Sequence, residues 1–261
     1  MTCVPETFPH PVAAPVAAAA GDPPSLSAAR PPGLPAAVLW DMDGTLIDTE
    51  PCWIAAERDL VESFGGTWTQ QDTEALIGMA LLDAAEVFQR LGVDLEAREI
   101  ALRLTATVID VLSTATFQPG ALDLLAQLRA AGVPSALVTA SYRPMVDAVV
   151  ALTPPGSFAA VVTGDEVARG KPDPLPYLRA AELLGVAPTH CVAIEDSPPG
   201  ITAALASGAR TLGVPHQVPV PSRPGLSRVA SLADVTLADL VALRRGEVID
   251  RLAVVDAGPV R

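Results

Sequence analysis

Cysteine and histidine are scarce in this chain, with three residues of each among 261. Neither set has the spacing of metal ligands, which argues against a zinc site, and three cysteines make no disulfide framework. Reduced thiols are therefore the expectation, and with them a cytoplasmic location. The six residues lie at Cys3, His10, Cys52, His190, Cys191 and His216.

Basic residues are also scarce. Seventeen Lys and Arg stand against thirty Asp and Glu, for a net charge of −13 and a pI near 4.5. This excess of negative charge argues against nucleic acid or an anionic membrane as a partner. An anionic substrate would need a local metal ion or lysine to overcome it. No segment is long and apolar enough to predict a membrane span.

Aromatic residues make up only 4% of the chain, although 50% of its residues are hydrophobic. A substantial core is therefore available, and it must be built mainly from Ala, Val and Leu. The length fits one large domain, or a core domain that carries a smaller insert.

Residues 1–34 differ in composition from the rest of the chain. Pro and Ala dominate them, and such a segment cannot bury enough apolar surface to fold, so we predict a disordered tail. Its Ala-rich stretch, residues 12–20, has no basic residue before it and is interrupted by Pro15, unlike a signal peptide. A tail, or a start codon assigned too far upstream, explains the composition better.

Two aspartates follow the first apolar run, residues 36–40, which predicts a short buried strand. Asp41 and Asp43 then lie two apart on extended backbone, and Gly44 allows a sharp turn after them. In open α/β sheets ligands bind beyond the carboxyl ends of strands. Two crowded carboxylates there favour a hard cation, and Mg²⁺ fits best. An Asp-Gly surface turn is the ordinary alternative.

Helical periodicity dominates the next segment, residues 51–116, which we predict to be an all-helical insert. Segments 35–50 and 117–235 flank it and form the predicted core domain. Residues 236–261 form a C-terminal extension with one possible helix.

Strand and helix patterns alternate after Pro119. Such alternation predicts an α/β fold, a Rossmann-like parallel sheet with helices on both faces. The expected strands are residues 36–40, 135–139, 159–162, 191–194 and 210–214.

Polar residues lie where several of these strands end, which is where an α/β site is built. Each alone has an ordinary explanation, such as a helix cap, an exposed turn or an acid in the first turn of a helix. Their order on successive strand ends favours a single site. They are Thr139, Ser141 and Arg143 after one strand, Lys171 in a Gly-Lys-Pro loop, and Glu195 and Asp196 at the end of another.

With these residues in view, the chain resembles the haloacid dehalogenase superfamily, in its phosphatase branch. The four motifs of that family match residues 41–45, 137–141, Lys171 and residues 194–200, and the resemblance extends over about residues 36–215. Four motifs in this order are specific for the superfamily and say little about the substrate.

The insert looks like the α-helical cap of the subgroup that contains β-phosphoglucomutase and small sugar-phosphate phosphatases. The resemblance implies that Asp41 is the nucleophile that forms an aspartyl-phosphate. Asp43 would be the general acid, then the base for water. Thr139 and Lys171 would bind phosphoryl oxygens.

The same resemblance implies Mg²⁺ as the cofactor. The ion would be held by Asp41, the backbone carbonyl of Asp43, and Asp196, with Glu195 supporting directly or through water.

A phosphoglucomutase is the first alternative. Mutases of this subgroup carry a His after the first motif and an Arg in a Gly-rich cap loop; here those places hold Trp53 and Leu81. Both departures favour hydrolysis. Leu81 is expected to pack in the cap, whereas Trp53 could either pack there or face the substrate.

Two other classes are open to test. A metal-free dehalogenase would not keep Asp43 or the acidic pair Glu195 and Asp196. A non-catalytic binding descendant would be expected to lose Asp41 or Lys171, and both are present.

The expected partner is a small-molecule phosphate ester, with Ser141, Arg143, Trp53, Gly78 and Met79 as candidate substrate-binding residues. An uncharged cap favours sugar or polyol monophosphates over bisphosphates, and nucleoside monophosphates remain an alternative. A monomer is expected.

Overall fold

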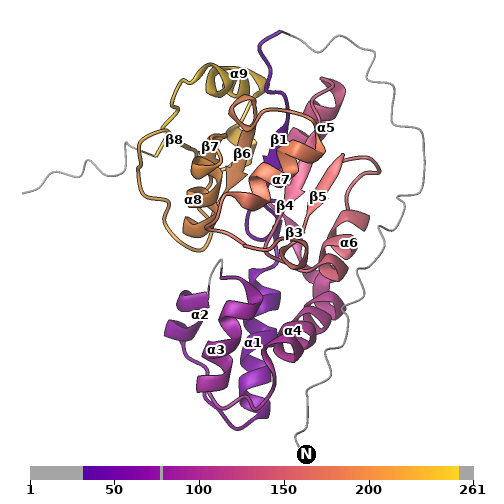
Figure 1. Ribbon diagram of the computed structural model, residues 1–261, viewed down its shortest axis with the longest axis vertical. Coiled ribbons are helices and arrows are strands. Elements are labelled where there is room, and N and C mark those ends of the chain that lie inside the picture. Colours follow the sequence, from indigo (N-terminus) through magenta and orange to yellow (C-terminus); the bar gives the residue numbers. More distant parts are fainter. Residues whose placement is uncertain (1–31, 77–78, 253–261) are drawn as a thin grey trace, which may run out of the picture.

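The computed structural model describes residues 32–76 and 79–252 of the chain (Figure 1). Almost all of the predicted tail therefore lies outside the described residues. Its last residue, Leu34, belongs to the packed structure, because its side chain is only 5% exposed.

A six-stranded sheet forms the centre of the larger lobe. Every neighbouring pair of strands is parallel, which confirms the predicted α/β class. Strand β8, at one edge, had no clear signal in the sequence. In spatial order the strands are β5 (Ala160–Val162), β4 (Ser135–Val138), β1 (Val38–Trp40), β6 (Val192–Glu195), β7 (Arg210–Gly213) and β8 (Leu226–Arg228).

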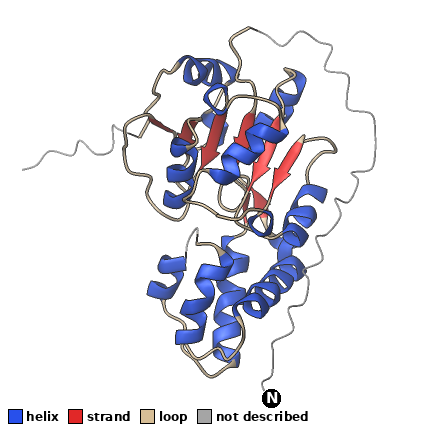
Figure 2. Cartoon of the chain, viewed as in Figure 1, coloured by secondary structure: helices blue, strands red, loops and turns tan. Residues whose placement is uncertain are grey.

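Helices cover both faces of this sheet (Figure 2). Alternate residues of β1 point to opposite faces. Val38 and Trp40 share a hydrophobic cluster with helices α5, α6 and α9, whereas Leu39 packs with α7 and α8. Both faces of the sheet are therefore buried at β1, as is usual for a parallel sheet. The helices are α5 (Ala121–Ala130), α6 (Arg143–Ala151), α7 (Leu175–Leu183), α8 (Pro198–Ala206) and α9 (Leu237–Arg245).

The smaller lobe consists of helices and follows β1 in the chain. Its helices span the segment that the periodicity predicts to be helical, residues 51–116. Phe88 and Ile100 are fully buried in its core, and Trp68 stacks on Phe88 at 5.9 Å between ring centroids. The helices are α1 (Glu50–Ser63), α2 (Gln70–Leu76), α3 (Leu81–Arg90) and α4 (Ala97–Val111).

Two short strands join the lobes: β2 (Ile47–Asp48) pairs antiparallel with β3 (Thr116–Phe117). His216, in the loop after β7, contacts both connections, with Nε2 3.0 Å from Asp48 Oδ1 and Nδ1 3.2 Å from Gln118 Nε2. Because the chain enters and leaves the helical lobe through this ribbon, we propose it as the boundary of the insert, residues 51–116.

The segment assigned from sequence as a C-terminal extension contains α9. A capping box opens this helix, since Thr236 Oγ1 accepts a hydrogen bond from the backbone of Asp239 while the Asp239 carboxylate accepts one from the backbone of Thr236. Leu240 and Leu243 are buried in the core, so α9 completes one helical layer of the sheet. Among the described helices, none combines the length and apolar composition of a membrane span.

Candidate active site

The aspartates of the first motif leave the carboxyl end of β1 in a tight turn. The backbone amides of Leu46 and Ile47 both donate to the carbonyl of Met42. Gly44 has φ of 81°, and a Cβ built there would lie 2.3 Å from Asp196 Oδ2. Glycine is therefore required both by its backbone conformation and by the close approach of the Asp196 carboxylate.

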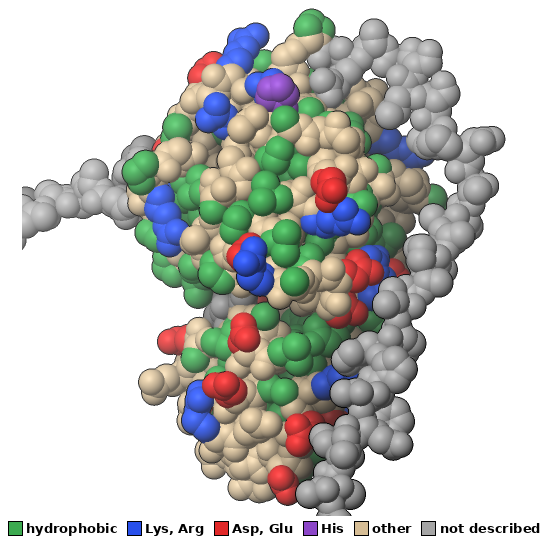
Figure 3. All heavy atoms as spheres, viewed as in Figure 1, with side chains coloured by type: hydrophobic (Ala, Val, Ile, Leu, Met, Phe, Trp, Pro, Cys, Tyr) green, Lys and Arg blue, Asp and Glu red, His purple; other side chains and the backbone are tan. Residues whose placement is uncertain are grey.

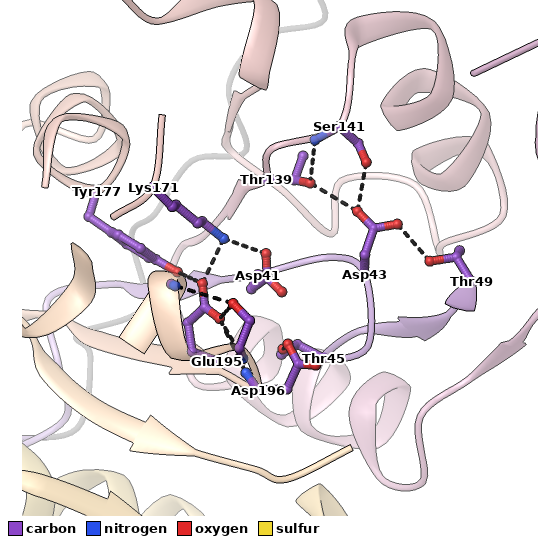
Figure 4. Close-up of polar contacts among 12 residues, drawn as sticks. Asp41, Asp43, Thr45, Thr49, Thr139, Ser141, Lys171, Tyr177, Glu195 and Asp196 are labelled. Atoms are coloured by element: carbon purple, nitrogen blue, oxygen red, sulfur yellow. Dashed lines mark hydrogen bonds and ion pairs between the residues drawn. The ribbon is translucent and has the colours of Figure 1, made fainter. Parts of the chain in front are cut away.

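A buried ammonium group sits among the acids at this edge (Figure 4). Lys171 Nζ lies 2.5 Å from Asp41 Oδ1 and 2.6 Å from Glu195 Oε1. All three side chains are less than a tenth exposed. Lys171 is also the single lysine of the chain, and its compact point charge can contact two carboxylates that face it from different strands. It supplies the local cation that the acidic chain needs.

One ammonium does not neutralise this cluster. Burial and the nearby Glu195 raise the pKa of Asp41 to about 7, although Lys171 opposes the shift. Burial and the charge of Asp41 raise the pKa of Asp196 well above its usual range. Burial would lower the pKa of Lys171, but the charges of Asp41 and Glu195 outweigh it and raise that pKa. The surplus of negative charge calls for another cation or for protons.

The donor set fits a hard divalent cation. Carboxylate oxygens of Asp41, Glu195 and Asp196 lie within 4.8 Å of one another, and oxygen ligands of this kind suit Mg²⁺. No donor among the described residues reaches the backbone carbonyl oxygen of Asp43, which leaves it available as a ligand. Asp41, Asp196 and this carbonyl are therefore the residues that would hold the ion.

Both carboxylate oxygens of Glu195 accept hydrogen bonds from the protein. Its Oε1 accepts hydrogen bonds from Lys171 and Tyr177, at 2.6 Å each. Its Oε2 accepts from the backbone amides of Asp196 and Ser197 and from the Ser197 hydroxyl. Because protein donors already occupy both of its oxygens, these contacts favour support of the ion through water over direct ligation, and the role of Glu195 at the metal stays a prediction.

Tyr177 was missed by sequence reasoning. It is fully buried on α7, and the ammonium of Lys171 lies 5.4 Å from the centre of its ring. Burial and Glu195 raise the pKa of its hydroxyl well above the ordinary value, so Tyr177 remains a donor to Glu195. Its position in the first turn of α7, just after the Lys171 loop, was the available signal.

Asp43 is held by four donors. Ser141 Oγ and Thr139 Oγ1 donate to its Oδ2, at 2.7 and 3.1 Å. Thr49 Oγ1 and Trp53 Nε1 donate to its Oδ1, at 2.6 and 3.1 Å. Thr49 directly precedes α1, but its hydroxyl donates to Asp43 and does not cap the helix. The donors come from both lobes, so the orientation of the Asp43 carboxylate depends on how closely the two lobes approach each other.

A cavity lies between the lobes and contains most of the candidate residues. Asp41, Asp43, Thr139, Lys171 and Asp196 line its base, and Ser141, Trp53 and Met79 also face it. Gly78 lies outside the described residues. Leu81, predicted to pack in the cap, is buried there and also lines the cavity.

Arg143 is a substrate-binding candidate that does not line this cavity. Its guanidinium pairs with Glu166, with Nη2 2.5 Å from Oε2, and lies 3.6 Å from Asp147 Oδ1. Arg143 is the first residue of α6, and the acids beside it on the surface occupy its hydrogen-bonding groups. We therefore leave Arg143 out of the site.

Two further acids face the same cavity, Glu50 and Glu57 of α1. They lie on the face of α1 that also presents Trp53 and Ile54 to it. Spacings of three, four and seven residues along a helix place side chains on one face. The sequence shows this spacing, but it does not show that this face of α1 points into the cavity.

A parallel sheet that ends in two aspartates, a buried lysine and acids whose oxygens suit a divalent cation, closed by a helical lobe, is typical of enzymes that hydrolyse phosphate monoesters. The family model for haloacid dehalogenase-like hydrolases matches residues 35–208. The chain belongs to this family.

Individual relatives agree with the assignment. The chain is 34% identical over 191 residues to hexitol phosphatase A of Escherichia coli, covering 67% of this chain and 81% of that protein. It is 31% identical to protein CbbY of Rhodobacter capsulatus, covering 69% and 86%. The crystal structure of a mutant CbbY from Rhodobacter sphaeroides with xylulose-(1,5)bisphosphate superposes with a TM-score of 0.73 at 27% identity, covering 79% of this chain and 99% of that one.

The contact between Trp53 and Asp43 leads to a prediction. Trp53→Phe keeps an aromatic side chain and removes the N–H donor to Asp43, so kcat should fall about ten-fold, the worth of one hydrogen bond to a charged group. Steady-state kinetics with an aryl phosphate and saturating Mg²⁺ would measure this. Trp68→Phe is the matched control, since it removes another tryptophan donor of the same lobe, the one to Thr73. Equal losses in both variants would contradict a specific role for Trp53.

Proposed function

We propose that this enzyme is a Mg²⁺-dependent phosphatase that hydrolyses a small sugar or polyol monophosphate through an aspartyl-phosphate on Asp41. The observation that carries the proposal is the position of Asp41 at the base of the cavity between the lobes, with its carboxylate against Lys171. A carboxylate held beside a fixed positive charge is placed to attack phosphorus while that charge stabilises the phosphoryl oxygens.

The residues divide the reaction into two halves. In the first, an Asp41 oxygen forms a bond to phosphorus as the bond from phosphorus to the alcohol oxygen breaks, and protonated Asp43 gives its proton to the departing alkoxide. In the second, Asp43 takes a proton from water, which attacks phosphorus and releases Asp41. Thr139 and Lys171 bind phosphoryl oxygens throughout. When bound by Asp41 and Asp196, Mg²⁺ would offset the charge on the phosphoryl group.

Hydrolysis is favoured over a mutase reaction by the chemistry of the cavity. A mutase must hold a second phosphate while the substrate turns, which requires cations at the far end. Among the described residues that line this cavity, Lys171 is the sole cation, and it is engaged with Asp41 and Glu195. Trp53, at the place of the mutase histidine, donates to Asp43 instead.

The relatives support a sugar or polyol monophosphate. One is named a hexitol phosphatase, and another, from Thermotoga maritima, a phosphorylated carbohydrates phosphatase. On the face of this molecule shown in Figure 3, Arg side chains are dispersed and form no basic patch among the described residues, in keeping with a small-molecule partner. A monomer and a cytoplasmic location, with Cys52 and Cys191 as free thiols, complete the proposal.

Phosphate release from a panel of sugar, polyol and nucleoside monophosphates tests this function. We expect release with Mg²⁺ that falls at least about 100-fold when EDTA removes the metal and returns when Mg²⁺ is added back, because the acids around Asp41 then lack their counter-charge. β-Glucose 1-phosphate belongs in the same panel. Its conversion to glucose 6-phosphate without phosphate release would instead favour the mutase.

A further inference from the structure

The wall of the cavity that α1 forms is acidic. Glu50 and Glu57 lie seven residues apart on α1, and both line the cavity. Trp53 and Ile54 lie between them on the same face of the helix. This wall is thus an apolar strip with a carboxyl group at each end.

Neither carboxyl group has a hydrogen-bond donor within the described part of the chain. Nowhere in residues 32–76 and 79–252 does a side chain or a backbone amide donate a hydrogen bond to Glu50 or Glu57, and no cation there pairs with them. Elsewhere on the cavity wall the acids are satisfied: Asp43 by four donors, and Asp41 by Lys171. Half-buried acids without protein donors keep their lone pairs available to water or to a ligand that enters the cavity.

Burial and neighbouring charges also raise the pKa values of Glu50 and Glu57. Burial, followed by the charge of Glu50, raises the pKa of Glu57 to about 8. Burial, followed by the charges of Asp43 and Asp48, raises the pKa of Glu50 to about 7. A second anion entering this space would meet the same repulsion, whereas hydroxyl groups would donate to the unpaired oxygens.

We propose that Glu50 and Glu57 select the leaving alcohol: they accept hydrogen bonds from the hydroxyl groups of a polyhydroxy alcohol and exclude alcohols that carry a second anionic group. The inference rests on the proposed function and narrows it. Phosphorylated sugar acids and bisphosphates are excluded, and uncharged polyol or sugar monophosphates are the substrate class.

Matched substrate pairs test the selection. Glucitol 6-phosphate and 6-phosphogluconate are open chains of six carbons that differ in a CH₂OH or a carboxylate at C1. Glycerol 3-phosphate and 3-phosphoglycerate form the same contrast with three carbons. At pH 8.5, above both raised pKa values, we expect kcat/KM to favour the hydroxyl member of at least one pair by about ten-fold or more.

Variants of Glu57 test whether this residue causes the preference in kcat/KM for the hydroxyl member of each pair. Glu57→Gln removes the charge and keeps a hydrogen-bonding group, so the preference should shrink several-fold. Glu57→Lys places a cation against the alcohol and should reverse it, raising kcat/KM for the carboxylate member. Glu62 is the matched control, because it lies on the same helix but is exposed and outside the cavity. Glu62→Gln and Glu62→Lys should leave the preference of the wild type unchanged.

The outcomes separate this inference from the function on which it rests. If the wild type hydrolyses both members of each pair equally, or Glu57→Lys changes both members by the same factor, the selection is wrong and the phosphatase stands. If the wild type releases no phosphate from any ester with Mg²⁺, both are wrong. Circular dichroism and Mg²⁺-dependent hydrolysis of an aryl phosphate would establish that each variant is folded.

Discussion

Asp41→Asn is expected to lower kcat for phosphate release by about 10⁴-fold or more, since removal of a nucleophile from a concerted set of groups has effects of this size. The amide keeps the shape of the side chain and cannot form the acyl phosphate. It also removes one of the acids that crowd Lys171, so we expect the fold to be retained. Steady-state phosphate release at saturating Mg²⁺ is the measurement.

A second measurement distinguishes loss of the nucleophile from loss of metal. Rapid acid quenching of the wild type with a ³²P-labelled substrate should trap label on the protein, and Asp41→Asn should carry none. Asp83→Asn, at an exposed position on α3, is the control and should keep both label and turnover. Retention of more than a few per cent of wild-type kcat in Asp41→Asn would contradict the covalent mechanism.

The arrangement of the catalytic edge could be predicted because the rule behind it is local. Parallel strands all run in the same direction, so the residues that follow successive strands meet at one edge of the sheet. Asp41 follows β1, Thr139 follows β4, and Asp196 follows β6. The order of polar residues along the chain was therefore enough to place them together before any contact was known.

Contacts made by packing could not be predicted in this way. Tyr177 reaches Glu195 because α7 crosses one face of the sheet, and its position just after the Lys171 loop does not by itself predict this contact. The same holds for Arg143, which was expected near the substrate because it follows Ser141. The first turn of α6 carries it to the acidic Glu166, a partner chosen by the fold and not by neighbours in sequence.

Short elements were also missed, for a related reason. Strands β2 and β3 contain two residues each, too few to show a period of two. Their pairing depends on closing a loop of 67 residues between Asp48 and Thr116. Glu50 and Glu57 are a similar case. The sequence predicts that they share one face of a helix, but only the folded structure, in which β2 pairs with β3, shows that this face lines the same cavity as Asp41.

The second large effect is expected at Lys171. Lys171→Met leaves Asp41, Glu195 and Asp196 buried without their ammonium, and loss of one partner from a buried ion pair typically costs about 3–5 kcal/mol. We expect a decrease of this order in the free energy of unfolding, measured in urea with EDTA, and a fall in kcat of about 10³-fold or more with Mg²⁺ present. Lys171→Arg should not restore kcat, because a planar guanidinium is larger than the ammonium that fits between Asp41 and Glu195.

Arg228→Met separates stability from chemistry. Arg228 is another buried cation, paired with Asp250 at 2.8 Å on strand β8, away from the residues that line the cavity. Its loss should destabilise the fold while kcat of the remaining folded protein stays near that of the wild type. If Arg228→Met and Lys171→Met lower kcat equally, general loss of packing and not the charge of Lys171 would account for the effect.

The most specific test of the Lys171 charge is how the loss of unfolding free energy in Lys171→Met depends on pH. Lys171 lowers the pKa of Asp41, which burial and Glu195 nevertheless raise to about 7, so its removal should raise that pKa further. An acid whose pKa is higher in the folded state than in the unfolded state binds more protons when folded, and stability then decreases as pH rises through the folded value. In EDTA the deficit of Lys171→Met relative to the wild type should therefore be small near pH 5 and grow toward pH 8. Added Mg²⁺ should reduce it at pH 8, because the ion supplies the missing positive charge. A deficit that is the same at every pH would mean that Lys171 stabilises the enzyme through packing of its aliphatic chain and does not neutralise the carboxylate of Asp41.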